Sequence, residues 1–373
     1  SSLLPSRLSA RKLVALATDS GTCSDMAEPR LLVVGCGAIG GILAGHLLEI
    51  GHDVSLLTTN SEIAAALRER GVRVTGDEPP VPAHARAVFE QLRPDVQPFD
   101  YIFLATQPPQ VEAAAESAAA WLAADGRVVC FQNGLCEERV AKFVGPDRVI
   151  GAVVAWGASM LEPGLYERTS SGGFSVGRPD GSRDSRLDHL ARILEAIGPV
   201  SITDNLRGAR WSKLAINCAI STLGTIGGDR LGVLMRQRYV RRLALELMTE
   251  VVAVARAENV RLEKVSGTLD LDWIALTPSE RTAAGSPGLM AKHTLLLAVG
   301  ARYRRLRSSM LAAIERGRPP AVEFLNGEVI SRAEQHGLTA PINRAARDLV
   351  WNIARGEAQA SHSTLRALYE RTR

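Results

Sequence analysis

The sequence predicts an α/β protein with an N-terminal, doubly wound parallel sheet followed by an all-helical C-terminal domain. From Arg30 to about residue 204, short apolar segments alternate with helical patterns, which is the order that builds parallel βαβ units. Beyond residue 204, strand patterns nearly vanish and apolar residues recur at helical spacing. With 373 residues, the chain is long enough for two domains with separate cores. We therefore expect domains over 30–204 and 205–373, and a disordered extension over 1–29.

Each element of the first domain is predicted from its own pattern. Apolar runs bounded by turn residues predict strands, and Ala- or Leu-rich segments with one polar face predict helices. We expect Ser61 to cap the second helix and Gly71 to end it. The predicted strands cover 31–35, 53–58, 72–75, 85–89, 101–105, 127–131 and 149–156, with two more within 165–177, and the predicted helices cover 38–50, 62–70 and 110–123.

The second domain shows helical periodicity throughout, interrupted by a loop over 277–287. Two arginine clusters, within 236–242 and 302–307, are interpreted as solvated helix faces, because few aromatic residues that could stack on nucleic-acid bases lie between them. The predicted helices cover 205–225, 236–259, 288–306, 322–336 and 342–355.

A glycine-rich turn joins the first predicted strand to the first predicted helix. Four apolar residues run into the pattern Gly35-x-Gly37-x-x-Gly40. In this strand–turn–helix context, the pattern indicates a Rossmann-like dinucleotide site rather than a βα turn that binds nothing. Gly35 permits the turn, Gly37 lets the backbone approach a pyrophosphate, and the helix N-terminus offers free N–H groups. The predicted cofactor-contacting residues here are Gly35, Cys36, Gly37, Ala38, Ile39 and Gly40.

A second chemical signal lies near the start of the helical domain, in the predicted helix 205–225. Lys213, Asn217 and Ser221 are spaced four residues apart, so on a helix they form one stripe that drifts by about 40° per step. The opposite face of this helix is also apolar, so neither side is a typical solvent face. A buried lysine has a lowered pKa and can act as a general acid near neutral pH. The alternative is a surface stripe with a snorkelling lysine.

Five motifs in order give the chain a family resemblance. It resembles the ketopantoate reductase (2-dehydropantoate 2-reductase) family over about residues 30–355. The motifs are Gly35-x-Gly37-x-x-Gly40, Asn133-Gly134, Trp211-Ser-Lys213-Leu-Ala-Ile-Asn217, Ser308-Ser309-Met310 and Leu325-Asn326-Gly327.

The resemblance implies roles for individual residues. Lys213 would protonate the ketone oxygen while NADPH delivers hydride to the carbonyl carbon. Asn217 would hydrogen-bond the substrate, and Ser309 would hold its carboxylate. Asn133 would lie between the domains, near both nicotinamide and substrate. Ser221, which replaces a frequent second asparagine, would also face the substrate.

The chain also departs from the family pattern. Ala321 stands where the family has a glutamate that touches the substrate, and Glu323 stands at a following aspartate. Without that glutamate, a partner for a substrate hydroxyl is missing, which favours a different substrate. Gln107 replaces a frequent lysine near the cofactor, and Thr59 replaces a frequent arginine after the second strand.

The end of the second predicted strand bears on the choice of cofactor. An acidic residue there would favour NAD through the ribose hydroxyl, but the chain reads Thr58-Thr59-Asn60-Ser61. Hydroxyl and amide groups can hold a 2′-phosphate. We therefore expect NADP, with Thr59, Asn60, Gln107 and Asn133 among its contacts.

Composition excludes several classes of protein. Cysteines 23, 36, 130, 136 and 218 include no Cys-x-x-Cys pair, which is typical of a reduced cytoplasmic protein rather than of a disulfide or zinc framework. No apolar run reaches the roughly 18 residues of a membrane span. The net charge of +4 suits a phosphate-bearing ligand without arguing for nucleic acid. We expect no metal, membrane or nucleic-acid partner.

These observations together predict a cytoplasmic enzyme of pantothenate biosynthesis that reduces 2-dehydropantoate, or a close 2-keto acid, with NADPH. One alternative is a relative that acts on another 2-oxo acid or an imine, indicated by Ala321 and Gln107. The other is a catalytically silent nucleotide-binding protein, against which the intact Lys213, Asn217 and Asn133 argue. The oligomeric state stays open, with a homodimer as one alternative.

Overall fold

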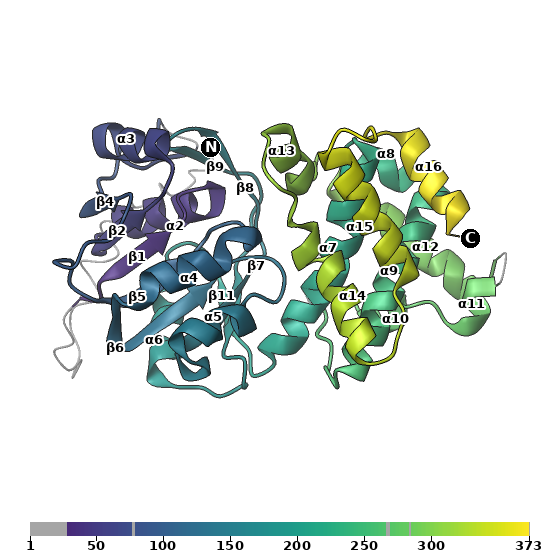
Figure 1. Cartoon of the computed structure of the whole chain (residues 1–373), viewed down its shortest axis with the longest axis horizontal. Helices are drawn as coiled ribbons and strands as arrows, with labels where there is room; N and C mark the ends of the chain where they lie inside the picture. Colours follow the sequence, from purple (N-terminus) through teal and green to yellow (C-terminus); the bar gives the residue numbers. More distant parts are fainter. Residues whose placement is uncertain (1–27, 77–78, 266–268, 283–284, 373) are drawn as a thin grey trace, which may run out of the picture.

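The computed structural model describes residues 28–76, 79–265, 269–282 and 285–372. Figure 1 shows two bodies beside one another, a sheet flanked by helices and a bundle of helices. The predicted disordered extension over 1–29 lies, up to residue 27, outside the described residues. The predicted fold class is confirmed, since a mainly parallel sheet with helices precedes an all-helical domain.

The main sheet of the first domain has eight strands in the order β11-β10-β7-β6-β5-β1-β2-β4. Neighbouring strands are parallel except β10 and β7, which are antiparallel. The carboxyl ends of the central strands therefore share one edge. The strands are β1 (Leu31–Val34), β2 (Val54–Leu57), β4 (Ala87–Phe89), β5 (Phe99–Leu104), β6 (Leu122–Cys130), β7 (Val149–Val154), β10 (Phe174–Gly177) and β11 (Val200–Ile202).

Both faces of this sheet are buried, because alternate residues of each strand enter different cores. In β1, Leu31 and Val33 pack with the first helix, whereas Leu32 and Val34 pack on the opposite face. All four are at most 4% exposed, which explains why the strand reads as one continuous apolar run. The helices are α2 (Ala38–Glu49), α3 (Ser61–Arg70), α4 (Val111–Ala119), α5 (Glu137–Val144) and α6 (Ser185–Glu195), with short 3-10 turns η1 (Pro108–Gln110) and η2 (Pro146–Arg148).

A smaller sheet covers the outer side of α2. It joins β3 (Arg73–Thr75), β9 (Leu165–Arg168) and β8 (Ala158–Glu162) in that order. Tyr166 of β9 is fully buried against α2, where a Cβ added at Gly41 would come within 2.2 Å of its ring. A glycine at this position of α2 therefore lets the small sheet pack directly on the helix.

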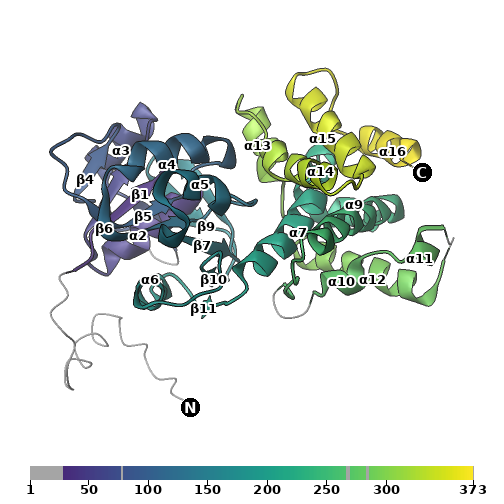
Figure 2. The ribbon, with the colours of Figure 1, turned by 60° about the horizontal axis from the view of Figure 1, so that its bottom comes forward.

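The second domain is built around two long helices, α7 and α9, which pack along each other (Figure 2). Trp211 of α7 is fully buried in its core. Among the described residues, no helix is both long and apolar enough to cross a lipid bilayer. The helices are α7 (Leu206–Gly227), α8 (Leu231–Arg236), α9 (Arg238–Ala257), α10 (Leu271–Ile274), α11 (Pro278–Thr282), α12 (Pro287–Arg302), α13 (Ser309–Glu315), α14 (Asn326–Gln335), α15 (Pro341–Ala354) and α16 (His362–Arg371), with a 3-10 turn η3 (Ala321–Phe324).

Several local predictions were wrong. Asn60, not Ser61, caps α3, since its Oδ1 accepts from the Ile63 N–H at 2.9 Å. The helix predicted over 110–123 ends at Ala119, and β6 already begins at Leu122. The helix predicted over 322–336 is broken at Leu325, which leaves η3 and α14. The elements not predicted were β8, β11, α5, α6, α8, α10, α11, α13 and α16, most of which are short.

Candidate active site

The glycine-rich turn after β1 has the shape that a dinucleotide requires. Gly35 has φ of +94°, and a Cβ there would come within 2.7 Å of the Thr106 backbone nitrogen at the end of β5. A Cβ at Gly40 would lie 2.0 Å from the Gly35 carbonyl oxygen, so α2 could not pack on the turn. At Gly37, in contrast, no described atom outside the chain neighbours lies within 4 Å. The turn is thus closed on the protein side and open at the N-terminus of α2, where a pyrophosphate would lie.

Buried contacts hold this turn in place. The Tyr166 hydroxyl donates to the Cys36 carbonyl oxygen at 2.9 Å, which ties the turn to the small sheet. The Cys36 thiol is buried and lies 3.8 Å from the Leu57 carbonyl oxygen. Burial raises the pKa of this thiol to about 12, so Cys36 packs as a neutral side chain. Ala38 and Ile39 form the first turn of α2 that follows.

The end of β2 lies next to this turn, and it presents hydroxyl and amide groups. Thr59 and Asn60 are exposed there. Because the Asn60 side-chain oxygen caps α3, its amide Nδ2 is the group left to donate to a ligand. Arg68, which lies in α3, pairs with Glu90 at 2.9 Å and with the Val88 carbonyl oxygen, so it is directed toward β4.

One face of α7 is covered at both ends and open in the middle. Toward its N-terminus, Leu206 and Arg210 are buried against the sheet domain. Toward its C-terminus, a Cβ added at Gly224 would lie 3.1 Å from Ser308. Between them, the half-buried residues recur at helical spacing, so this stripe of α7 stays partly open and, at Lys213, contacts the sheet domain. The half-buried residues are Lys213, Ile216, Asn217, Ile220 and Ser221.

Lys213 reaches from this stripe to the carboxyl end of the sheet. Its Nζ donates to the carbonyl oxygen of Val154, the last residue of β7, at 2.6 Å. Burial, together with a smaller effect of the nearby Arg210 cation, lowers the pKa of Lys213 from 10.5 to about 7. An ammonium group with such a pKa can give up a proton near neutral pH, and this one lies at the edge where parallel sheets bind ligands.

Asn217 and Ser221 follow Lys213 along the stripe. The Asn217 Nδ2 is buried and has no hydrogen-bond partner among the described residues. A buried amide without a partner is costly, so its donor capacity is available to a ligand. The Ser221 carbonyl oxygen accepts from Thr225 and Ser308 within the fold.

The loop after β6 brings Asn133 to the domain interface. Asn133 is exposed, and the next residue, Gly134, has φ of +92°. A Cβ at Gly134 would lie 2.6 Å from the Phe324 carbonyl oxygen, so η3 of the helical domain packs directly on this loop. Gln107 is also exposed and lies three residues after the end of β5, as the residue that precedes η1.

The two serines before α13 have different surroundings. Ser308 is buried, and its Oγ lies 2.8 Å from the Thr225 hydroxyl and 2.9 Å from the Ser221 carbonyl oxygen. Ser308 also caps α13, so its role is structural. Ser309 is exposed as the first residue of α13. This helix lies on the side of the helical domain that faces the sheet domain (Figures 1 and 2).

Ala321 and Glu323 separate in the structure. Ala321 is half-buried and begins η3, which contacts η1 of the sheet domain. Glu323 is exposed, and its Oε1 accepts from the Trp351 indole at 2.6 Å. Glu323 is therefore bound to α15, away from the position that a substituted carboxylate at 321 would occupy.

Asn326 belongs to the packing of the helical domain. It is fully buried, its Oδ1 accepts from Thr222 at 2.6 Å, and its Nδ2 donates to Asn343 at 2.8 Å. Asn343 in turn donates to the buried carboxylate of Glu250 at 2.8 Å. This chain of hydrogen bonds joins α7, α14, α15 and α9 without reaching the open stripe.

Sequence reasoning missed Arg210, a buried arginine one turn before Lys213. It is 3% exposed, its Nε donates to Glu137 at 2.7 Å, and its Nη atoms donate to the carbonyl oxygens of Gln132 and Cys130. An arginine directly before a buried tryptophan, inside an apolar helix, is the sequence signal that could have indicated it.

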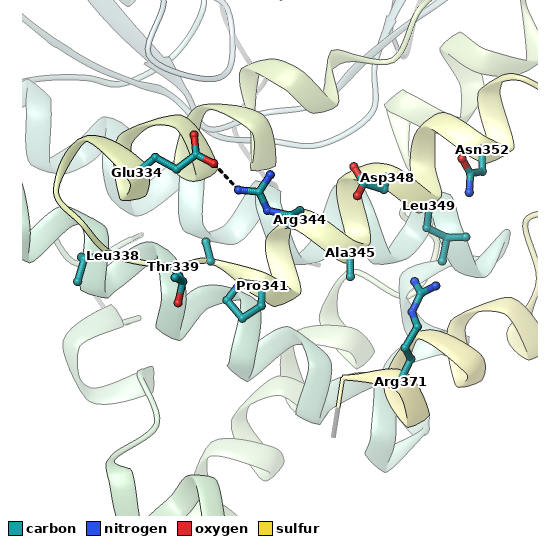
Figure 3. A pocket seen from close by; sticks show the side chains of 11 residues that line it. Glu334, Leu338, Thr339, Pro341, Arg344, Ala345, Asp348, Leu349, Asn352 and Arg371 are labelled. Atoms are coloured by element: carbon teal, nitrogen blue, oxygen red, sulfur yellow. Dashed lines mark hydrogen bonds and ion pairs between the residues drawn. The ribbon is translucent and has the colours of Figure 1, made fainter.

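A cavity of about 540 Å³ lies elsewhere, along α15 (Figure 3). Leu338, Ala345 and Leu349 line it, together with the ion pair between Arg344 and Glu334. Arg371 of α16 reaches into it from the side. None of the predicted site residues lines this cavity. Among the described residues, no cluster of His, Cys, Asp and Glu side chains could hold a metal ion.

Comparisons with known proteins agree on one family. The protein-family model described as "Ketopantoate reductase PanE/ApbA" matches residues 31–181, and the family model "Ketopantoate reductase PanE/ApbA C terminal" matches residues 205–354. A 2-dehydropantoate 2-reductase of Pyrococcus horikoshii is 25% identical, covering 88% of this chain and 97% of its own. Another, of Mesorhizobium japonicum, is 26% identical, covering 79% of this chain and 89% of its own.

Solved structures share the two-domain architecture. A PanE/ApbA family ketopantoate reductase from Ralstonia eutropha has a TM-score of 0.73 and 25% identity, covering 88% of this chain and 99% of its own. A D-mandelate dehydrogenase, solved with NADH and anilino(oxo)acetate, also has a TM-score of 0.73, with 19% identity over 91% of this chain and 99% of its own. This second likeness concerns the fold alone.

Proposed function

The chain belongs to the ketopantoate reductase PanE/ApbA family, and from this premise we propose that it reduces a 2-keto acid to the 2-hydroxy acid with a nicotinamide nucleotide. The observation that carries the proposal is the position of Lys213, which lies on the open stripe of α7 within reach of the carboxyl end of β7. The named activity of the relatives, 2-dehydropantoate reduction, supports the same reaction class.

The reaction requires a proton donor for the carbonyl oxygen and polar groups that orient the substrate, and the stripe of α7 carries both. A bound nicotinamide nucleotide supplies the hydride. As the carbonyl oxygen gains negative charge, Lys213 donates a proton to it, and its positive charge stabilises that oxygen before transfer. Asn217, whose Nδ2 is unpartnered among the described residues, donates to the substrate and orients it. Asn133, Ser221 and Ser309 would supply further polar contacts.

NADP is the proposed cofactor form. The residues present fit a dinucleotide, since the space beyond Gly37 is open and the N-terminus of α2 faces it. No carboxylate stands at the end of β2 to hold a ribose 2′-hydroxyl, which favours the 2′-phosphate. Thr59 and the Asn60 amide are the groups that would donate to it, with Gln107 and Asn133 nearer the nicotinamide.

The assay that tests this proposal follows NADPH oxidation by the purified protein with 2-dehydropantoate beside a panel of other 2-keto acids. The same panel with NADH measures cofactor preference. We expect turnover of at least one 2-keto acid, faster with NADPH. A nucleotide that binds without turnover across the whole panel would contradict the proposal and favour the silent nucleotide-binding protein.

A second candidate substrate class is favoured by Ala321. The family glutamate is absent there, and Glu323 is bound to Trp351 and so cannot replace it. The physiological substrate would then be a 2-keto acid that carries no hydroxyl at the position the glutamate contacts. In the panel, such a substrate would be turned over faster than 2-dehydropantoate.

Ala321→Glu is expected to raise kcat/KM for 2-dehydropantoate by about 10- to 150-fold, because a hydrogen bond to a charged group contributes about 1.5–3 kcal/mol. A 2-keto acid without a hydroxyl should gain nothing, and this comparison is the control. Equal change for both substrates would show that residue 321 does not contact the substrate hydroxyl.

The pH dependence of turnover follows from Lys213. Its pKa of about 7 means that the protonated acid, which ketone reduction needs, is lost as the pH rises above this value. We expect kcat for reduction to be flat below about pH 7 and to fall by up to about tenfold per pH unit above it. Oxidation of the hydroxy acid needs the deprotonated amine and should rise over the same range. A reduction rate that rises with pH would rule out Lys213 as the acid.

A further inference from the structure

Arg210 connects the two domains at the candidate site, where Asn133 comes from the sheet domain and Lys213 from the helical domain. Its guanidinium lies between the loop that carries Asn133 and the helix that carries Lys213. The contacts are made to residues on both sides of Asn133: the Cys130 and Gln132 carbonyl oxygens, at 2.7 and 2.8 Å, precede it, and the Glu137 carboxylate, 2.7 Å from Nε, follows it. All three guanidinium nitrogens are therefore used to hold one loop.

The burial of the Arg210–Glu137 ion pair indicates that the pair serves to fix the geometry of this contact. Arg210 and Glu137 are 3% and 5% exposed, and burying two charges has a large desolvation cost that a salt bridge often does not recover. Apolar side chains of similar size would hold two domains together without that cost. A fixed planar fork of donors, in contrast, sets the distance and angle of the loop relative to the helix.

Three consecutive residues at the start of α5 form ion pairs with residues of the helical domain, and these three ion pairs differ in burial. The first pair is buried, whereas the carboxylate of the second is 55% exposed and its ion pair is open to solvent. Exposed pairs contribute little to stability or geometry. The pairs are Glu137 with Arg210, Glu138 with Arg332 and Arg139 with Glu328.

We infer that Arg210 is a positioning residue, which fixes Asn133 relative to Lys213 by clamping the 130–137 loop onto α7. The inference rests on the proposed function, since it concerns the geometry of hydride transfer. Arg210 lies three residues before Lys213, so a change in the contacts of the Arg210 side chain also moves the first turns of α7. A misplacement of about 1 Å at such a site can lower a rate by about 100-fold.

Arg210 also acts on Lys213 through its charge. Its cation lowers the pKa of Lys213, in addition to the larger effect of burial. The Glu137 carboxylate is the counter-charge that touches Arg210 directly. Removing the cation should therefore raise the pKa of Lys213, and removing the carboxylate should lower it.

The test uses the full chain with three variants at this clamp, Arg210→Lys, Arg210→Met and Glu137→Gln. Lysine keeps the charge but cannot reach two carbonyl oxygens and a carboxylate together. We expect Arg210→Lys to lower kcat by about 10- to 100-fold, with KM and the Kd of NADPH changed by less than about threefold. The alkaline limb of the pH profile should stay in place for Arg210→Lys. It should move to higher pH for Arg210→Met and to lower pH for Glu137→Gln.

Two matched controls separate positioning from stability. Glu138→Gln makes the same chemical change one residue along α5, at the exposed pair, and should leave kcat unchanged. Lys292→Met breaks a buried pair with Glu280 that lies at 2.5 Å in the helical domain, and should lower Tm without lowering kcat. Tm and NADPH binding are measured for every variant.

The outcomes are distinguishable. If Arg210→Lys and Glu137→Gln lower Tm as Lys292→Met does but keep kcat within about twofold, the role is structural and the inference is overturned. If the unmodified protein turns over no 2-keto acid, the proposed function fails instead. Opposite shifts of the pH limb for Arg210→Met and Glu137→Gln, with reduced kcat, support the positioning role.

Discussion

Lys213→Met is expected to lower kcat for 2-keto acid reduction by about 100- to 10,000-fold, the range that a positioned general acid contributes. Methionine keeps the length and apolar contacts of the lysine stem but removes the proton donor and the positive charge. The stem lies among half-buried residues of α7, so the helix should fold normally. The loss should therefore appear in kcat, because the charge on the ketone oxygen develops in the transition state.

Binding and a surface lysine provide the controls for this variant. The glycine-rich turn is on the other domain from Lys213, so the Kd of NADPH, measured by fluorescence, should change by less than about threefold. Lys142→Met, at a side chain 68% exposed on α5, should leave kcat unchanged. Turnover of Lys213→Met within about tenfold of the unmodified protein would mean that another group donates the proton.

Features encoded by neighbouring residues could be predicted from the sequence. The glycine-rich turn is local, since the close approaches at Gly35 and Gly40 involve the turn itself and the adjacent strand end. The stripe of Lys213, Asn217 and Ser221 follows from the period of one helix. Which parts of this stripe are covered does not follow from that period, because it depends on which other elements pack on α7.

Pairings between distant residues could not be predicted. Arg210 and Glu137 are separated by 73 positions, and nothing in the sequence around either residue indicates that the two form a pair. The same holds for Glu323 and Trp351, whose contact decides that Glu323 cannot act in place of residue 321. Asn326 has a place in the family motif, yet its hydrogen bonds to Thr222 and Asn343 give it a packing role.

Elements were missed where the apolar pattern is short. α16 buries Leu365 and Leu368 as its large apolar residues, and the five-residue α11 lies within a segment predicted as a loop. Two or three apolar residues do not define a period. The cap of α3 shows a different ambiguity, since Asn60 and Ser61 are both good N-cap residues and tertiary packing selects between them.

Gly37→Ala is expected to weaken NADPH binding by at least about tenfold while leaving the Tm of the free protein unchanged. Since no described atom outside the chain neighbours lies within 4 Å of a Cβ at Gly37, and its φ of −77° suits any residue, the added methyl meets nothing in the protein. It would instead occupy the space that a pyrophosphate needs at the N-terminus of α2.

Two other glycines make this prediction specific. Gly40→Ala places a Cβ 2.0 Å from the Gly35 carbonyl oxygen, so it should lower both Tm and nucleotide affinity. Gly76→Ala, also in open space but outside the turn, should change neither. If Gly37→Ala is the one variant of these three that loses affinity for NADPH without losing stability, the open side of the turn is the phosphate site. If Gly37→Ala binds NADPH as the unmodified protein does, the nucleotide must lie elsewhere, and the proposed hydride transfer beside Lys213 loses its geometric basis.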